Sequence, residues 1–248
     1  MILLKSLQEI AKMEVANRIV AEILEGVKEK VQPGIETREL DELAEEMCRK
    51  HRVKPAFKGY RGYPRSICVS VNEEVVHGIP GPRCLKAGDV VSLDFGVKYE
   101  GYYGDAAITV GVGEVGAKAR ALIAATEESL YAGINQVKAG KRLSDISHAV
   151  QTVVEGAGFG VIREFVGHGI GRSLHEDPQI PNFGPPGRGP ALQVGMTFAI
   201  EPMTSMGSWK VRILQDGWTA VTQDGSYAAH FEHSVALTEN GVLILSRL

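Results

Sequence analysis

The chain has 248 residues, 44% of them hydrophobic and 23% charged, which is enough apolar material for one sizeable core or at most two small ones. The formal net charge is −3 and no run of five basic residues occurs, so the composition gives little support to a nucleic-acid partner. No stretch approaches the ~20 apolar residues of a membrane span, and the apolar run at the start is too short for a signal peptide.

The three cysteines, Cys48, Cys68 and Cys84, are 20 and 16 residues apart and form no CxxC pair. An odd and scattered set of this kind argues against a disulfide framework and against a zinc ribbon. We therefore expect a reducing, cytoplasmic location.

Two helices are predicted at the start of the chain. Ser6 followed by Glu9 forms a capping box, and apolar residues then repeat with the helical period as far as Val27. A Pro-Gly pair ends this first helix, and Thr37 is expected to cap a second one. The second helix ends on residues 49–52, whose positive charges the helix dipole favours. Strand-like runs follow at 65–71, 89–97 and 101–113.

The same order of elements then recurs. Residues 116–137 predict a long helix, residues 138–158 predict a turn and a shorter helix, and further strands follow from 161 onward. Aligning 31–40 with 137–146, at an offset of 106, pairs Gly34 with Gly140. We therefore expect a single domain, 1–248, that contains an internal duplication with halves of roughly 1–112 and 113–248 and a site between them.

Two aspartates flank a predicted hairpin loop at 98–101. Asp94 and Asp105 are equally far from the centre of this loop, so in a regular hairpin they would lie directly opposite each other, with Cβ atoms about 4.5–5.5 Å apart. Like charges in such a pair are destabilising. The pair is tolerated only if one carboxyl group stays protonated or a cation lies between the two.

Two histidines occur seven positions apart in the segment "FVGHGIGRSLHEDP" at 165–178. The three glycines around His168 disfavour a helix, because each interior glycine costs roughly 1 kcal/mol relative to alanine. In one straight strand the odd spacing would point His168 and His175 to opposite faces. We therefore predict a strand at 161–166 followed by irregular backbone, from which both rings can reach one cleft.

Two glutamates interrupt apolar runs, Glu201 in 196–203 and Glu232 in 228–237. Each alone is typical of a surface residue on an edge strand, and His168 alone is typical of a hydrogen-bonded structural histidine. Together with the two aspartates they form a different pattern. Four carboxylates and one imidazole suit two divalent cations such as Mn, Fe, Co or Zn, and they fit a structural zinc site badly. Two such metals with a bridging water form a hydrolytic centre.

Four segments, 90–110, 165–184, 195–203 and 231–237, resemble the type I methionine aminopeptidases in order and spacing, and the resemblance extends over nearly the whole chain. It implies an α+β pita-bread fold, in which two pseudo-symmetric α/β halves surround a curved antiparallel sheet with helices on the outer face. It also implies an aminopeptidase that removes the N-terminal (initiator) methionine and prefers a small second residue. The implied substrates are N-terminal Met peptides and nascent polypeptides, the latter at the ribosome, and the implied state is a monomer.

The resemblance also assigns roles to residues. It makes Asp105 and Glu232 bridging ligands of two divalent metals, and it makes Glu201 both a ligand and the general base. The same likeness places His175 on the substrate carbonyl and His77 near the scissile nitrogen; without it, His77 is typical of a loop histidine beside a Gly-Ile-Pro turn. The remaining implied ligands are Asp94 and His168, and the implied methionine pocket is formed by Tyr60, Tyr63, Cys68, Leu174 and Trp218, with Leu174 in place of a phenylalanine found in some relatives. The other histidines, His51, His148, His230 and His233, are expected to be structural, although His233 could support its neighbour Glu232.

Two alternatives stay open. The first is a metallopeptidase of the same fold that cleaves Xaa-Pro peptides, either an aminopeptidase or a prolidase. The second is a non-catalytic binding protein that keeps the fold; it is disfavoured because such proteins typically lose metal ligands, and all five are present here. Type II relatives carry a helical insertion for which this chain has no room, and eukaryotic type I forms carry an N-terminal zinc-binding extension. The compact bacterial type I form is therefore expected.

Overall fold

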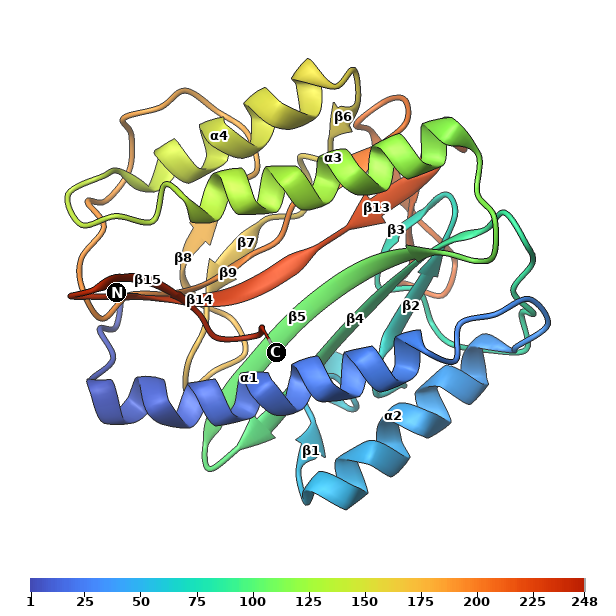
Figure 1. Ribbon diagram of the computed structural model, residues 1–248, viewed down its shortest axis with the longest axis horizontal. Helices are drawn as coiled ribbons and strands as arrows, with labels where there is room; N and C mark the ends of the chain where they lie inside the picture. Colours follow the sequence, from blue (N-terminus) through green and yellow to red (C-terminus); the bar gives the residue numbers. More distant parts are fainter. Residues whose placement is uncertain (248) are drawn as a thin grey trace.

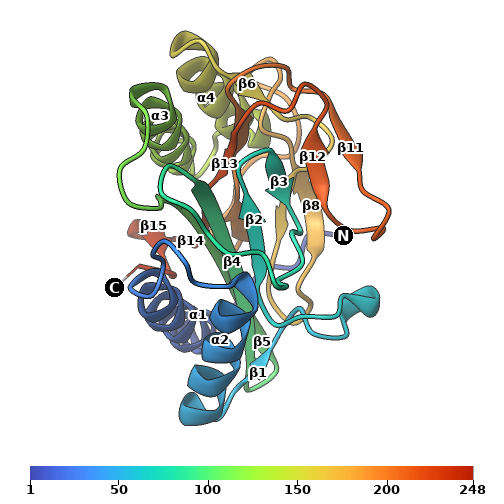
Figure 2. The same ribbon diagram turned by 90° about the vertical axis from the view of Figure 1, so that its right-hand side faces the viewer.

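Two pairs of helices cover one face of a curved antiparallel sheet (Figure 1). The computed structural model describes residues 1–247. Viewed along the sheet, α1 and α3 lie on one side of it and the strands β3, β11 and β12 lie on the other (Figure 2). Within the described residues, no helix has both the length and the apolar character needed to cross a bilayer. The helices are α1 (Leu7–Lys28), α2 (Thr37–His51), α3 (Ala117–Ile134) and α4 (Leu143–Gly156), with a 3-10 turn, η1, at Tyr60–Gly62.

The main sheet has nine strands in the order β1-β4-β5-β14-β9-β7-β8, with β2 added beside β4 and β15 beside β14. All its pairings are antiparallel. Its strands are β1 (Lys54–Pro55), β2 (Cys68–Val71), β4 (Val90–Tyr99), β5 (Tyr102–Gly111), β7 (Gly167–Gly169), β8 (Glu176–Ile180), β9 (Thr197–Ile200), β14 (Glu232–Thr238) and β15 (Gly241–Ile244).

Two three-stranded sheets accompany the main sheet, in the orders β13-β10-β6 and β11-β12-β3. The second of these bounds the side of the main sheet that the helices leave open (Figure 2). Their strands are β3 (Glu74–Val76), β6 (Gly160–Val161), β10 (Met203–Ser205), β11 (Val211–Ile213), β12 (Ala220–Thr222) and β13 (Ala228–His230).

The first helix pair follows the predicted signals with one difference. Ser6 and Glu9 form the predicted capping box at the start of α1. The second helix starts one residue earlier than predicted, because Glu36 rather than Thr37 is the N-cap residue of α2. The hydroxyl of Thr37 instead exchanges hydrogen bonds with the backbone of Gly81, at 3.1 and 2.9 Å, which ties the start of α2 to a distant loop.

The hairpin of β4 and β5 corrects the predicted pairing of its aspartates. Its turn consists of Glu100 and Gly101, both at positive φ (45° and 86°), as in the two-residue turns that match strand twist. This turn pairs Tyr99 with Tyr102, one position beyond the predicted centre, so Asp94 lies opposite Ala107 and Asp105 opposite Gly96. The two aspartates are therefore diagonal neighbours on one face of the hairpin, not directly opposite each other.

The segment before His168 also differs from the prediction. Only Val161 of the expected strand at 161–166 belongs to a strand, where it pairs with Thr204 of β10. The chain then leaves that small sheet in irregular backbone and enters the main sheet as β7, beside β9. His168 is thus held by strand hydrogen bonds rather than by a loop, and a register shift directly after it alters the direction of the chain.

Equivalent features recur in the two helix pairs. Glu36 and Arg142, 106 residues apart, are the N-cap residues of α2 and α4. Each forms an isolated antiparallel bridge, to Cys84 and to Ala191 respectively. One hydrophobic cluster packs α1 and α2 on β4, and a second packs α3 and α4 on β9 and β14. These features agree with the predicted duplication, while the single-domain boundary at 1–248 stays a prediction.

Candidate active site

Five neighbouring strands of the main sheet, β4, β5, β14, β9 and β7, each bring one predicted ligand to the centre of the molecule. Asp94 lies on β4, Asp105 on β5, Glu232 on β14 and His168 on β7, while Glu201 follows β9 directly. The strands are far apart in sequence, so the order of the sheet is what brings these residues together.

The register places the acidic residues of β4, β5 and β14 on one face. Ala107 of β5 lies opposite Asp94 on one side and opposite Glu232 on the other. Residues directly opposite each other in an antiparallel pair point to the same face, and so do residues two apart in one strand. Asp94, Asp105 and Glu232 therefore share a face, with the small side chain of Ala107 between them.

The same argument extends to β9 and β7. Ala199 lies opposite Ser234 of β14 and opposite His168 of β7. Ser234 is two positions from Glu232, and Ala199 is two positions from Glu201, so period-two alternation predicts one face for all of them. This face is opposite to the helices, and it is the face that the β11-β12-β3 sheet bounds (Figure 2).

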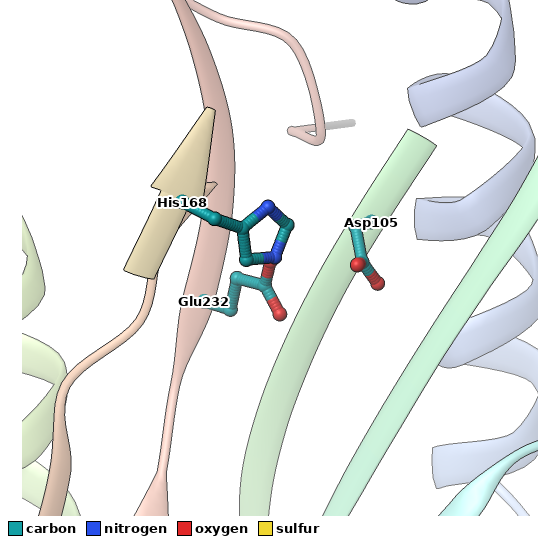
Figure 3. A group of neighbouring side chains, drawn as sticks. All are labelled: Asp105, His168 and Glu232. Carbon is teal, nitrogen blue, oxygen red and sulfur yellow. The ribbon is translucent and has the colours of Figure 1, made fainter. Parts of the chain in front are cut away.

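The ligand atoms converge within metal-binding distance. One atom each from Asp105, His168 and Glu232 lies within 4.8 Å of the other two, and the three side chains point toward one another (Figure 3). Glu201 joins them, because its Oε1 is 3.4 Å from His168 Nε2. The Nδ1 of His168 is 2.9 Å from the carbonyl oxygen of Gly169, which can only accept a hydrogen bond. Nδ1 therefore carries the proton and leaves the lone pair of Nε2 free to face the acids.

The acidic residues of this cluster lack the partners that buried carboxyl groups normally have. Asp94 Oδ1, Asp105 Oδ1 and Glu232 Oε1 are buried without a hydrogen-bond partner among residues 1–247. Burial raises the pKa of Asp94 to about 7. Burial first, and neighbouring carboxylates second, raise the pKa of Asp105 and of Glu232 far above the usual range. Such an arrangement is costly unless protons or cations neutralise it.

Two further histidines lie beside the cluster. The ring of His175 is 4.3 Å from the ring of His168, centroid to centroid, and its Nδ1 is 2.8 Å from the hydroxyl of Tyr60. His77, at a φ of 61°, packs edge-on against Phe165 and Trp218. Burial is the main cause that lowers the pKa of both His77, to about 4, and His175. Both rings are therefore neutral at pH 7.

A cleft of about 470 Å³ contains the acids together with aromatic and apolar side chains. Tyr63 and Trp218 meet in it edge to face, with centroids 5.2 Å apart, and the Tyr63 hydroxyl donates to the carbonyl oxygens of Ile67 and Gly78. All the residues predicted for the ligand set, the histidine pair and the methionine pocket line this one cleft: Tyr60, Tyr63, Cys68, His77, Asp94, Asp105, His168, Leu174, His175, Glu201, Trp218 and Glu232, together with Phe57.

Comparison with known proteins decides the family. The profile of metallopeptidase family M24 matches residues 11–239. Methionine aminopeptidase 1 of Bacillus subtilis is 54% identical over 248 residues, which cover 100% of both chains. The crystal structure of methionine aminopeptidase from Thermotoga maritima has a TM-score of 0.98 at 53% identity, again over 100% of both chains. The chain belongs to the methionine aminopeptidases of metallopeptidase family M24.

Membership of this family makes the protein a hydrolase that works with divalent metal, and it confirms the predicted pita-bread fold. The Xaa-Pro alternative has weaker support. Prolidase from Pyrococcus furiosus has a TM-score of 0.81 at 22% identity, covering 99% of this chain and 65% of its own, so the likeness is one of fold alone.

Two residues in this methionine aminopeptidase escaped the sequence reasoning. Phe57 lines the cleft, and nothing in its local pattern indicates that position. His230, expected to be structural, is buried at the end of β13 with its Nε2 3.6 Å from Glu201 Oε2. A signal did exist in the sequence, since 228–237 reads as one strand, on which positions 230 and 232 would share a face, although the structure divides this run into β13 and β14.

His233, unlike His230, points away from the acidic cluster. It lies opposite Ala106 of β5, one position from Glu232, and so faces the helix layer. Its Nδ1 is 2.8 Å from Ser246 Oγ and its Nε2 is 3.3 Å from the hydroxyl of Tyr131 on α3. It is therefore structural, as expected, and it does not face the ligand side of Glu232.

Proposed function

We propose that this methionine aminopeptidase removes the N-terminal methionine from peptides and nascent polypeptides, with a preference for a small second residue. One observation carries the proposal. Buried, unpartnered ligand atoms from neighbouring strands line the same cleft as an apolar pocket with aromatic walls. The unpartnered ligand atoms suit a hydrolytic metal centre, and the aromatic pocket suits a methionine side chain.

The residues fit divalent cations. Within residues 1–247, one carboxyl oxygen each of Asp94, Asp105 and Glu232 is buried without a hydrogen-bond partner, and His168 directs a lone pair toward them. Four carboxylates can neutralise two divalent cations, and oxygen-rich sets with imidazole suit Mn, Fe, Co or Zn. In strand order Asp105 and Glu232 are central, with Asp94 on one flank and Glu201 and His168 on the other. We infer that Asp105 and Glu232 would hold divalent cations at the centre, with Asp94 on one side and Glu201 and His168 on the other completing the ligand set.

Cations bound there supply Lewis acidity, which lowers the pKa of water and polarises a carbonyl group. Glu201 then acts as the general base: its carboxylate accepts a proton from the attacking water and passes it toward the leaving amine. The side chain is positioned by the end of β9, where Pro202 follows directly.

The two histidines orient the substrate. In this proposal the Tyr60 hydroxyl donates to His175 Nδ1, 2.8 Å away, so that the ring carries its proton on Nε2 and donates to the carbonyl oxygen as negative charge develops there. His77, beside Trp218, faces the scissile nitrogen in this proposal. Both roles need neutral rings, and burial keeps the two rings neutral at pH 7.

The pocket suits an unbranched thioether. Tyr63, Cys68 and Leu174 are buried in one hydrophobic cluster, and Trp218 packs against it. Sulfur in a methionine side chain makes favourable contacts with aromatic rings. Cys68 lies opposite Asp94 in the pairing of β2 with β4, so the pocket wall and the ligand array share two adjacent strands.

A peptide-release assay tests the function. Metal-free protein is loaded separately with Co²⁺, Mn²⁺, Fe²⁺ and Zn²⁺, and each form is given Met-Ala-Ser and an Xaa-Pro peptide. We expect methionine release from Met-Ala-Ser and negligible cleavage of the Xaa-Pro peptide. Preference for the Xaa-Pro peptide would replace the methionine assignment, and no turnover of any N-terminal Met peptide by metal-replete protein would revive the binding-protein alternative.

Location and assembly complete the proposal. Cys48, Cys68 and Cys84 are all free, which is compatible with the predicted reducing, cytoplasmic location. We propose that a monomer meets nascent chains at the ribosome. Analytical ultracentrifugation tests the monomer, and co-sedimentation with translating ribosomes tests the place of encounter.

A further inference from the structure

His230 is a buried imidazole with no hydrogen-bond partner. It ends β13 at 1% exposure, and neither Nδ1 nor Nε2 has a partner within the described residues. Buried polar atoms in native proteins are almost always paired, so an imidazole with two unpaired nitrogens requires an explanation. Nothing in the proposed catalytic sequence uses this ring.

Hydrogen bonds to the backbone of His230 hold this residue in place and thereby position its ring. The hydroxyl of Thr109 on β5 accepts from the His230 backbone N–H at 2.9 Å and donates to its carbonyl oxygen at 2.6 Å. His230 also lies opposite Met203 in the pairing of β13 with β10. These contacts hold the ring at the edge of the acidic cluster, where one atom each from His230, Glu201 and Glu232 lies within 4.8 Å of the other two.

The spacing around Glu201 is that of ligands around an ion. Its Oε1 is 3.4 Å from His168 Nε2, and its Oε2 is 3.6 Å from His230 Nε2. Ordinary hydrogen bonds of this kind are about 2.7–3.2 Å long. Two atoms that each lie ~2.1 Å from one cation at tetrahedral angles are about 3.4 Å apart. The Glu201 carboxylate is thus flanked by two imidazoles at similar, ligand-like distances.

We propose that His230 is an additional ligand of the metal centre, binding through Nε2 the cation that Glu201 and Glu232 hold. The inference rests on the proposed metal centre, and it adds a second imidazole to a set that otherwise contains only His168. Imidazole suits Zn, whereas carboxylate and water suit Mn, and sites with nitrogen and oxygen ligands generally bind Co²⁺ more tightly than Mn²⁺. The second imidazole therefore biases the centre toward Co²⁺ or Zn²⁺ over Mn²⁺.

Metal titration of matched variants tests the inference. Metal-free wild type, His230→Gln and His233→Gln are titrated calorimetrically with Co²⁺ and with Mn²⁺, and the visible spectrum of each Co²⁺ form is recorded. Glutamine keeps the hydrogen-bonding capacity of His230 but is a poor ligand. We expect His230→Gln to weaken Co²⁺ binding by about tenfold or more, to weaken Mn²⁺ binding less, and to change the Co²⁺ absorption bands. His233→Gln, on the opposite face of the neighbouring strand, should leave all three unchanged.

A measurement on the wild-type protein tests the inference even if the His230→Gln variant fails to fold. X-ray absorption of the Co²⁺-loaded wild type should report two imidazoles per centre. One imidazole, or wild-type affinity and an unchanged spectrum in His230→Gln, would overturn the role of His230 while leaving the metal centre intact. If the wild type itself binds no Co²⁺, the proposed centre fails and the role of His230 fails with it.

Discussion

The two faces of the main sheet satisfy their polar groups in different ways. On the helix face, His233 bonds to Ser246 and Tyr131, and Asn17 of α1 bonds to Met13 and to the backbone of Asp105. On the cleft face, several buried polar atoms have no hydrogen-bond partner in the described part of the chain. Within residues 1–247, seven buried side-chain atoms lack a hydrogen-bond partner, and five of them belong to Asp94, Asp105, His230 and Glu232.

This difference indicates that the helix face contributes mainly to stability and the cleft face mainly to function. A buried polar group without a partner costs free energy, so a fold keeps several of them in one place only where something absent from the chain compensates. On the helix face, the polar side chains of His233 and Asn17 find their hydrogen-bond partners within the protein. The cleft face needs protons or cations to neutralise its acids.

The following changes should affect the two faces in different ways.

The largest effect is expected at Glu232. Glu232→Gln keeps the size of the side chain but removes a central negative charge, so the cleft holds divalent cations poorly. Because such cations contribute several kcal/mol to transition-state stabilisation, kcat/KM should fall by about 10³-fold or more. Steady-state kinetics and elemental analysis of the purified variant measure both losses.

His233→Gln is the matched control, one position away on the opposite face. It should keep metal and turnover, while the free energy of unfolding falls by about 1 kcal/mol through weakened hydrogen bonds to Ser246 and Tyr131. Full activity and full metal content in Glu232→Gln would contradict the division between the faces.

A large loss of stability is expected at the ion pair that joins the N-terminal segment to the rim of the cleft. Lys5 Nζ contacts the carboxylate of Glu176, and the two side chains are only 5% and 8% exposed. Glu176 directly follows His175 and also accepts from the backbone N–H of Ser173. Lys5→Met leaves this carboxylate buried and unpaired, so the free energy of unfolding should fall by about 3–5 kcal/mol in urea denaturation.

The double variant Lys5→Met/Glu176→Gln separates charge from packing. It should recover a large part of the lost stability, because the unpaired charge is then absent. No recovery would assign the loss to the buried lysine stem rather than to the ion pair.

A smaller, purely kinetic effect is expected at His175. His175→Ala removes the proposed donor to the carbonyl oxygen, and kcat should fall by about 10²-fold. Metal content should stay at the wild-type value, since the ring bonds to Tyr60 and not to the acids. Elemental analysis alongside the kinetics is decisive here, because loss of metal would contradict an orienting role.

The smallest effect is expected on the helix side, in the capping box of α1. The backbone N–H of Ser6 is the main cause that lowers the pKa of Glu9 to about 2, with help from Tyr102. A carboxylate with a lowered pKa stabilises the fold above its unfolded value near 4.5 and loses that contribution as the pH falls toward 2. Glu9→Gln should therefore be about 1 kcal/mol less stable than wild type at pH 7 and equal to it near pH 2.

Thermal unfolding across this pH range, followed by circular dichroism, measures the difference. A constant difference at all pH values would show that the charge of Glu9 does not contribute. Methionine release at pH 7 should be unchanged, since Glu9 caps α1 on its hydrogen-bonded first turn and does not line the cleft.

Local signals made the helices predictable and singled out residues that the structure brings into one cleft. The capping box at Ser6 and the apolar periods depend only on neighbouring residues, and the pattern of acids around His168 was specific enough to indicate metals. The pairing of Asp94 with Asp105 was wrong because the two-residue turn at Glu100 sets the register, and the choice between turn types was not evident from composition.

Long-range features were harder to predict. The order β4-β5-β14-β9-β7 joins strands from both halves of the chain, and it alone decides which residues become neighbours. The position of His230 beside Glu201 was not predicted for this reason: the distance depends on β13 and β9, which belong to different sheets. Period-two spacing to Glu232 was the only local indication.

The most direct test of the account is anomalous X-ray diffraction from crystals soaked in Co²⁺. The account predicts two strong peaks on the cleft face, among the side chains of Asp94, Asp105, His168, Glu201 and Glu232, and none on the helix face. Ordinary water between these side chains, with no anomalous signal, would mean that protons rather than cations neutralise the acids, and it would contradict the central claim.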